Sequence, residues 1–580
     1  MHDLGRWRDR RTPSSAQRLL HRHRRVGSDH ALSRPALRVA ARDSPLRDRV
    51  RVGNARQGVE RTASCCRSRP HAAQPTRRGR PRPRHRERSN RRSAIAVRSE
   101  RLRELFGLVP AAVLVSIGFA SVVAARGSEI ERVTLAYGAV FLALCLAVHL
   151  VIRRTLPLAD PYLFPLVATL AAVGLVELYR IDPDLARRQA QWLVVGLAVF
   201  AATVVWVRDP HRLERYRYTI AATSILLLAL PRLPVIGAQV NGAYLAVDIG
   251  PIQFQPAELA KVGIVIFLAS YLRDTAAVLV RARSPVGLRR RLPEAAVGAA
   301  VALALAGVTE ASAATATLTA LLAASTVAVL RDRPSPKHFG PLLLVWGLAM
   351  AMLVVIRDLG SSLMFFGGFL ALLWAATGRG SLTALGASLF AAGAAFLAGR
   401  IEHVHERVEI WLDPFRPDLV EGPGYQIAQS LFAQADGGLL GRGLGGAMLQ
   451  GLDGGTLLPA PHTDLIYAVV VNELGLAGAL GLLVIYLVVV ARGLRIALLS
   501  HDAYSKLLAA GLTAVLALQV FVIVGGVTRV IPLTGVTLPF VSYGGSSIVA
   551  NMIVLALLLM VSQHSRAERL RRGGLVEGAA

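Results

Sequence analysis

Cysteine and lysine are both scarce in this chain of 580 residues. Cys65 and Cys66 are adjacent and Cys145 lies in an apolar run, so the cysteines form neither a disulfide framework nor a CxxC zinc motif. Only three of the 66 basic residues are lysines. Because this bias disfavours lysine throughout, Lys261, which persists in an apolar segment, is a candidate functional residue.

Acidic residues are also few, since 37 Asp and Glu stand against 66 Lys and Arg, and the net charge is +29. Residues 1–104 hold 30 arginines, no lysine and 9 acidic residues, and so carry +21 of this charge. Charge segregated in this way disfavours a nucleic-acid-binding protein. Over the whole chain 53% of the residues are hydrophobic and the mean hydropathy is +0.47, which excludes a single soluble globular domain.

Residues 1–104 lack hydrophobic periodicity and contain clusters such as RRGRPRPRHRERSNRR. A segment of this composition buries too little apolar surface to offset the loss of chain entropy, so we expect a disordered, arginine-rich cytoplasmic tail. Because the composition changes abruptly at its end, a second interpretation is that translation begins near Val97.

From Leu105 onward, apolar runs of about 15–25 residues recur, each close to the length that crosses a hydrocarbon core of about 30 Å. We predict an all-α, polytopic membrane bundle of about 12–14 transmembrane segments over residues 105–565, followed by a short basic cytoplasmic tail, 566–580. The fourteen candidate segments are 105–125, 133–152, 161–179, 190–207, 218–231, 256–272, 294–309, 312–330, 340–356, 361–377, 382–399, 465–491, 504–526 and 543–562. An alternative for the seventh and eighth, 294–330, is a re-entrant hairpin.

Basic residues are distributed unequally between the connections. Alternate connections on the side of the N-terminus hold 23 Lys and Arg, and the opposite connections hold 12. By the positive-inside rule, both termini are cytoplasmic. The outer connections then include 232–255, 527–542 and a loop at 400–464 that is too long to be a mere link. Its glycine-rich run at 437–446 lacks the GK[ST] ending of a P-loop, which excludes a nucleotide-binding site.

Two groups of ionisable residues border apolar segments. Asp464 directly precedes the segment 465–491 on the outer side, where it could act as a helix N-cap, a general base or a metal ligand. Glu473 would lie about 14 Å deeper along the same helix. Pro256 predicts the start of a helix, which places Glu258 and Lys261 on one face of that helix. The two residues could form a structural ion pair or bind an anionic substrate.

Six ordered blocks resemble the SEDS family of shape, elongation, division and sporulation proteins, the RodA/FtsW group of peptidoglycan glycosyltransferases. The resemblance covers roughly residues 130–565. The blocks are NGAYLAVDIGPIQFQPAELAK, RDLGSSLMFFGGFLALLWAATGR, RVEIWLDPF, GYQIAQSLFAQADGGLLGRGLG, LLPAPHTDLIYAVVVNELGLAG and PLTGVTLPFVSYGGSS.

This resemblance implies polymerisation of lipid II on the outer face of the bacterial cytoplasmic membrane, for elongation, division or sporulation. It implies that Asp464 deprotonates the 4-hydroxyl of the acceptor sugar, directly or with a bound divalent cation, Mg²⁺ or Mn²⁺. It also implies that Lys261, Glu258, Arg407 and Glu473 contact the substrate. The partners implied are lipid II, membrane lipid and a class B penicillin-binding protein that acts as transpeptidase.

The sequence departs from the family pattern in three places. The double acid of the family reads Asn472-Glu473 here. Residues 275–335 add an apolar hairpin and a further segment lies near the N-terminus, so fourteen apolar segments stand where about ten are usual. Two alternative functions come from other classes: a flippase or transporter for lipid II, and a non-catalytic scaffold for a transpeptidase. An outward-facing Asp464 discriminates against a flippase, because a flippase needs no general base there.

Overall fold

The computed structural model describes residues 83–125, 132–281, 359–398, 402–447 and 457–577, apart from positions 235, 241, 242 and 251, together with scattered residues between 282 and 358. These elements all belong to the second of two units, Gly79–Ala580. The predicted segments 294–309, 312–330 and 340–356 lie outside the described residues, apart from those scattered positions.

The described chain is predominantly helical. Eight of its helices are long and apolar enough to cross a membrane, which confirms the predicted polytopic helical bundle. The helices are α1 (Pro83–Ala125), α2 (Arg132–Thr155), α3 (Leu163–Ile181), α4 (Pro183–Val207), α5 (His211–Arg215), α6 (Arg217–Ala229), α7 (Pro256–Arg281), α11 (Leu359–Thr377), α12 (Gly380–Ala398), α13 (Glu402–Leu412), α14 (Pro417–Val420), α15 (Tyr425–Gly437), α16 (Ile466–Leu499), α17 (Ala503–Val527) and α18 (Gly545–Glu577).

A small antiparallel sheet interrupts the all-α pattern between α6 and α7. It comprises β1 (Gly237–Val240), β2 (Ala243–Ile249) and β3 (Ile252–Phe254), in that order. Ala246 and Val247 on the central strand are buried. The sheet lies in a segment that the sequence marks only as turn-rich, and its last strand ends just before Pro256, where α7 begins as predicted.

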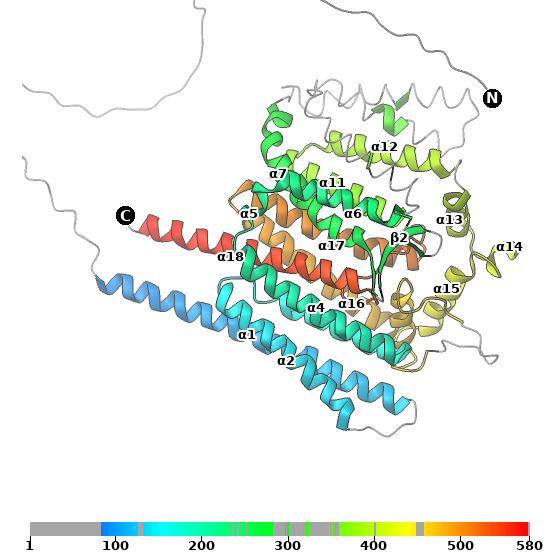
Figure 1. Cartoon of the computed structure of the whole chain (residues 1–580), viewed down its shortest axis with the longest axis horizontal. Coiled ribbons are helices and arrows are strands. Elements are labelled where there is room, and N and C mark those ends of the chain that lie inside the picture. The colour runs from blue at the N-terminus through cyan, green and yellow to red at the C-terminus, as the bar shows by residue number, and fades with distance from the viewer. Residues whose placement is uncertain are drawn as a thin grey trace, which may run out of the picture. The chain divides into compact units, whose positions relative to one another are not determined.

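The helices pack along their lengths into one bundle, with α4 against α18, α1 against α2 and α3, and α16 against α17. Small residues allow neighbouring helices to approach closely. A Cβ added to Gly196 of α4 would lie 2.9 Å from the Ile548 side chain of α18. Figure 1 shows α5 and the C-terminal end of α18 at one end of the bundle, and β2 with α13 to α15 at the other. We call these the inner and outer ends.

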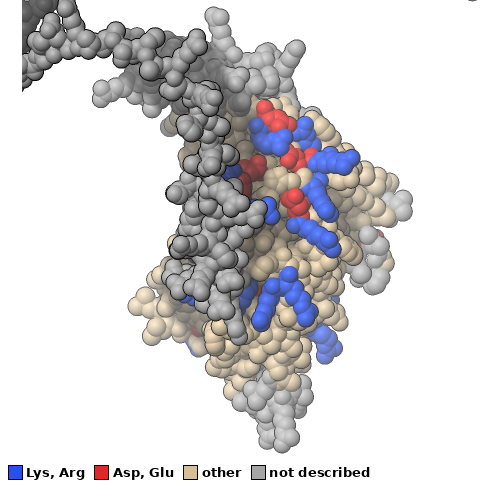
Figure 2. All heavy atoms as spheres, turned by 90° about the vertical axis from the view of Figure 1, so that its left-hand side faces the viewer, with Lys and Arg blue, Asp and Glu red and all other residues tan. Residues whose placement is uncertain are grey.

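Lys and Arg side chains lie at the inner end of the bundle, the end that holds the connections counted above on the side of the N-terminus. Figure 2 shows Lys and Arg side chains gathered there among Asp and Glu side chains. Ion pairs join segments that are far apart in sequence, such as Arg566 of α18 with Glu100 of α1 at 2.7 Å. The charged ends of these helices therefore lie together at the inner end.

α1 crosses the predicted boundary at residue 104. α1 begins at Pro83, so the helix that contains the first apolar run extends well into the segment expected to be disordered. At the other end, α18 continues to Glu577, and most of the basic tail at 566–580 is therefore helical. Apolar length locates a transmembrane core, but a helix can continue beyond it with a polar sequence.

α16 is interrupted at Gly475, whose φ of 68° is not helical. The glycine-rich run after α15 fills the break: Leu476 N–H donates to Gly438 O at 2.9 Å, and Gly443 N–H donates to Glu473 O at 2.9 Å. Backbone groups freed by a break in a membrane helix must be satisfied within the protein. The run therefore completes the hydrogen bonding of α16.

Substitution of Gly441 by alanine is expected to destabilise the fold. Gly441 has a φ of +79°, and its added Cβ would collide with the Glu473 carbonyl. The combined cost of strain and overpacking is about 2–4 kcal/mol. Thermal unfolding of the detergent-solubilised protein measures the loss. Gly481→Ala is the control, because no atom lies within 4 Å of its added Cβ; equal melting temperatures for the two variants would contradict the prediction.

Candidate active site

A cavity of about 1250 Å³ opens at the outer end of the bundle. The three outer connections singled out in the sequence, 232–255, 400–464 and 527–542, all contribute to its wall, and one face of α4 completes it. Its polar and charged lining residues are Arg188, Gln191, Gln253, Gln255, Glu406, Arg407, Gln426, His462, Thr463, Asp464, Arg529, Thr534, Thr537, Tyr543 and Ser546. The cavity thus gathers polar groups from segments far apart in the chain.

Asp464 lies in the cavity wall and is only 9% exposed. The N-cap residue of α16 is Leu465, and no side chain caps that helix, so the structure does not use Asp464 as the N-cap. Gly535, with a φ of +73°, brings the opposite loop close: a Cβ there would lie 3.6 Å from Asp464 Oδ2. The carboxylate therefore sits in a narrow part of the cavity.

The turn that carries Asp464 is held by the loop before α18. Tyr543 N–H donates to His462 O at 2.8 Å, and the Ser542 hydroxyl donates to Thr463 O at 2.7 Å. Gln189, buried on α4, fixes this loop in turn, since its Nε2 donates to Ser542 O at 3.0 Å and its Oε1 accepts from Gly544 N–H at 3.2 Å. A chain of hydrogen bonds from α4 thus sets the position of Asp464.

Burial shapes the protonation of the two titratable residues of this turn. Burial raises the pKa of the Asp464 carboxyl from its usual 3.8 to about 6, although the Arg407 charge and a hydrogen bond with Thr463 act in the opposite direction. Burial also lowers the pKa of His462. At neutral pH the site therefore holds an ionised but relatively basic carboxylate beside a neutral imidazole.

Three arginines line the cavity without an ion pair to a carboxylate among the described residues. Arg407 Nη1 donates to Leu533 O at 2.7 Å, and Arg529 Nε donates to Trp411 O at 2.8 Å. Arg188 on α4 is exposed and forms no hydrogen bond within the described chain. Neutral carbonyl acceptors orient Arg407 and Arg529 without forming an ion pair, which favours an anionic ligand.

Sequence reasoning found Arg407 but missed Arg188 and Arg529. The sequence could have pointed to Arg188, because two arginines, Arg187 and Arg188, in an outer connection are contrary to the positive-inside rule. Gln189 and Ser542 had no comparable signal, because their partners are far away in the sequence.

Glu258 and Lys261 form a buried ion pair on α7, and neither residue lines the cavity. Lys261 Nζ also donates to Gln519 Oε1 at 2.8 Å, and Gln519 Nε2 donates to Thr537 O at 2.9 Å. Thr537 belongs to the cavity wall. The pair therefore reaches the cavity through Gln519 and the backbone of Thr537.

Glu473 is fully buried and also lies away from the cavity. It accepts hydrogen bonds from Arg180 Nε at 2.7 Å and from Gly445 N–H at 2.9 Å. In this position it anchors the glycine-rich run to α3 and α16. Of the five residues predicted from the sequence, the structure thus brings Asp464 and Arg407 together and places the other three behind or beside the wall.

Eight membrane-crossing helices with a polar cavity at one end define a multi-pass membrane protein. The model of the FtsW, RodA and SpoVE family of cell cycle proteins matches residues 150–330 and 314–567, and the chain belongs to this family. The family resemblance seen in the sequence is confirmed.

Several relatives are similar over most of the chain. The peptidoglycan glycosyltransferase RodA of Mycobacterium tuberculosis is 39% identical over 443 residues, which cover 74% of this chain and 83% of the relative. The peptidoglycan glycosyltransferase RodA of Mycobacterium leprae is 36% identical and covers 80% of this chain and 90% of its own. A solved chain from a peptidoglycan synthase complex that coordinates polymerisation and crosslinking matches with a TM-score of 0.51 and 27% identity, over 70% of this chain and 98% of that chain.

Replacement of Asp464 by asparagine is expected to stabilise the protein above pH 6. The folded state holds the proton of Asp464 more tightly than the unfolded chain, so ionisation destabilises the fold as pH rises from about 4 to 6. Asp464→Asn removes this penalty, which amounts to about 3 kcal/mol at pH 8 and roughly half of that at pH 5.

Thermal unfolding of both proteins at the two pH values measures this difference. Asp248→Asn, at an exposed position on β2 outside the cavity, is the matched control for the loss of a carboxylate. A gain for Asp464→Asn that is the same at pH 5 and pH 8 would argue against the raised pKa.

Proposed function

We propose that this chain is a peptidoglycan glycosyltransferase that polymerises lipid II. The names of its relatives support the activity, because RodA proteins that are 36–39% identical are peptidoglycan glycosyltransferases. The single observation that carries the assignment in this chain is Asp464, a buried carboxylate with a pKa of about 6 in the wall of a large polar cavity. A flippase or a scaffold has no need of such a group.

Asp464 acts as the general base. Its carboxylate accepts the proton of the acceptor's 4-hydroxyl while that oxygen attacks the anomeric carbon of the donor sugar. The new C–O bond forms as the bond from the anomeric carbon to the diphosphate oxygen breaks, and undecaprenyl diphosphate leaves with the electron pair. A base with a pKa of about 6 is mostly ionised at neutral pH and still accepts a proton better than an ordinary aspartate.

The cavity arginines bind the diphosphate. Arg407 lies near Asp464, and Arg188 and Arg529 line other parts of the same wall. Their positive charge, which no ion pair neutralises, stabilises the negative charge that develops on the leaving group. Glu258 and Lys261 position this wall through Gln519, and Glu473 positions the glycine-rich run.

The outer end of the bundle faces the outside of the bacterial cytoplasmic membrane, and both termini are cytoplasmic. The excess of Lys and Arg in the inner connections supports this orientation. The tail of lipid II then stays in the bilayer while its sugars reach the cavity. A class B penicillin-binding protein is the proposed partner, which the coordination of polymerisation and crosslinking in the similar synthase complex supports.

A divalent cation, Mg²⁺ or Mn²⁺, fits the cavity. Asp464 offers a carboxylate, and Thr534 Oγ1, in the adjacent loop, is buried without a hydrogen-bond partner in the described structure. Magnesium commonly binds one or two carboxylates together with water and substrate phosphates. Asp464 and Thr534 would hold the cation, which would supply charge neutralisation for the diphosphate.

Loss of the Asp464 carboxylate is expected to abolish polymerisation. In a lipid II polymerisation assay with the partner transpeptidase present, Asp464→Asn should lower the rate at least about 100-fold, because general-base catalysis contributes that much or more. The wild-type rate should fall as pH drops through about 6, where Asp464 becomes protonated.

The control for this assay is Asp248→Asn, which removes an exposed carboxylate outside the cavity and should keep nearly full activity. Full polymerisation by a folded Asp464→Asn protein would favour the flippase or scaffold alternatives instead.

Chelation of divalent cations is expected to stop polymerisation, and added Mg²⁺ should restore it. Thr534→Val should raise the Mg²⁺ concentration for half-maximal rate several-fold, because the valine lacks a hydroxyl ligand. Thr528→Val is the matched control, since the Thr528 hydroxyl bonds within its own helix turn, to Val524 O at 2.7 Å. An unchanged rate in the presence of chelator would show that the reaction needs no cation.

A further inference from the structure

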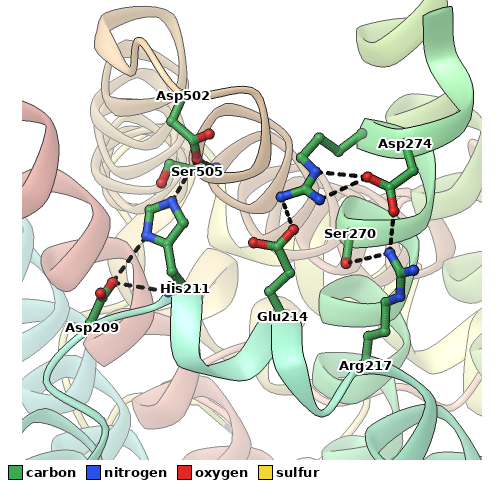
Figure 3. A network of polar contacts seen from close by, with 9 residues as sticks. Asp209, His211, Glu214, Arg217, Ser270, Asp274, Asp502 and Ser505 are labelled. Atoms are coloured by element: carbon green, nitrogen blue, oxygen red, sulfur yellow. Dashed lines mark hydrogen bonds and ion pairs between the residues drawn. The ribbon is translucent and has the colours of Figure 1, made fainter.

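Histidine and aspartate side chains from three segments meet at the inner end of the bundle. Figure 3 shows His211 between Asp209 and Asp502. Asp209 lies in the connection from α4 to α5, His211 is the first residue of α5, Asp502 precedes α17, and His564 lies on α18. One ligand atom from each of Asp209, His211 and His564 lies within 4.8 Å of the other two. We call these three residues with Asp502 the inner histidine cluster.

The position of His211 is fixed from both sides. Its Nδ1 lies 3.0 Å from Asp209 Oδ1, and its Nε2 lies 2.9 Å from Asp502 Oδ2. Each carboxylate is itself held: Asp209 Oδ1 accepts from the His211 backbone N–H at 3.0 Å, and Asp502 Oδ2 accepts from Ser505 N–H at 2.8 Å. The imidazole is therefore oriented before any ligand arrives.

His564 faces this arrangement from α18. Its ring centroid lies 4.9 Å from that of His211, and the two rings are tilted by 49°. Within the described part of the chain the His564 ring forms no hydrogen bond, although Asp209 and His211 are close by. A half-buried imidazole with a free nitrogen beside a carboxylate and a second imidazole is an available metal ligand.

The neighbouring polar network shows what the cluster lacks. Arg273 pairs with Glu214 and Asp274, and Arg217 pairs with Asp274 and contacts Ser270 (Figure 3). Each carboxylate of that network thus has an arginine. Among the described residues, Asp209 and Asp502 accept hydrogen bonds from histidine and backbone N–H groups but from no Lys or Arg side chain.

We propose that Asp209, His211 and His564 form a binding site for a borderline divalent transition metal, Zn²⁺ foremost, and that Asp502 orients His211 as a ligand. Two imidazoles and one carboxylate are a common zinc ligand set, with water in the fourth position. His211 Nδ1 coordinates the metal from the side of Asp209, while its Nε2–H donates to Asp502. A carboxylate that accepts the second N–H of a ligating histidine is the usual outer-shell arrangement.

Only a small movement closes the site. Ligand atoms around tetrahedral zinc are about 3.3 Å apart, close to the 3.0 Å between Asp209 and His211. Because the ligand atoms are at most 4.8 Å apart, a movement of roughly 1.5 Å by the His564 ring brings it to the metal. Bound metal would join α18 to the inner end of α4, whose outer end lines the cavity.

Metal titration of the full-length, detergent-solubilised protein tests the proposal after chelator treatment and removal of the chelator. Zn²⁺ binding is measured by calorimetry, and Co²⁺ binding by its visible absorption, which reports tetrahedral nitrogen and oxygen ligands. The wild-type protein should bind one metal per chain at this site. His564→Ala should weaken that binding at least about 100-fold, and Asp502→Asn, which removes an orienting group, by about 10–100-fold.

His501→Ala is the matched control, because His501 is exposed and adjacent to Asp502 but lies outside the cluster. The other histidines, including those of residues 1–104, are the same in every variant, so they contribute a constant background. Asp209→Asn provides a second ligand variant, and thermal unfolding without metal checks that each variant is folded. The proposal is overturned if no stoichiometric site is found, or if His564→Ala and Asp209→Asn bind as tightly as His501→Ala.

Discussion

The outer site depends on the hydrogen bonds between the turn that carries Asp464 and the loop before α18. Asp464 precedes α16, so no helical backbone fixes its position. Ser542 and Tyr543 hold the turn through backbone carbonyls, and Gln189 holds the loop. Because each partner comes from a different membrane helix or its flanking loop, the carboxylate is positioned only when the whole bundle is assembled. The raised pKa of Asp464 follows from the same packing, since burial is its largest cause.

Local physics made much of the architecture predictable. Apolar length marked the transmembrane cores, and Pro256 marked the start of α7. Pairings between distant residues were not predictable. The glycine-rich run was visible as a string, but its role in completing α16 depends on the break at Gly475, which sequence periodicity does not reveal. The extension of α1 to Pro83 was missed because polar helical sequence has no apolar signal.

Arginine side chains have different hydrogen-bond partners at the two ends of the bundle. At the inner end Arg273 and Arg217 pair with carboxylates, which neutralises their charge and joins α5, α6 and α7. At the outer end Arg407 and Arg529 are held by backbone carbonyls, which orient a guanidinium but do not neutralise it. Oriented cations that form no ion pair favour the diphosphate proposed as their ligand, whereas the arginines of the inner network are already paired. The same residue type thus has a structural role at one end and, in the proposed mechanism, a binding role at the other.

The buried ion pair of Glu258 and Lys261 is linked to the cavity wall without lining the cavity. Lys261 is 3% exposed and lies outside the cavity, so direct contact would require the wall to open. Removal of one partner would leave the other charge buried and unpaired, which is strongly destabilising. Lys261 also fixes Gln519, and Gln519 fixes the Thr537 carbonyl in the wall. Loss of either charge therefore disturbs the loop of residues 534–537, which includes Gly535 beside the Asp464 carboxylate.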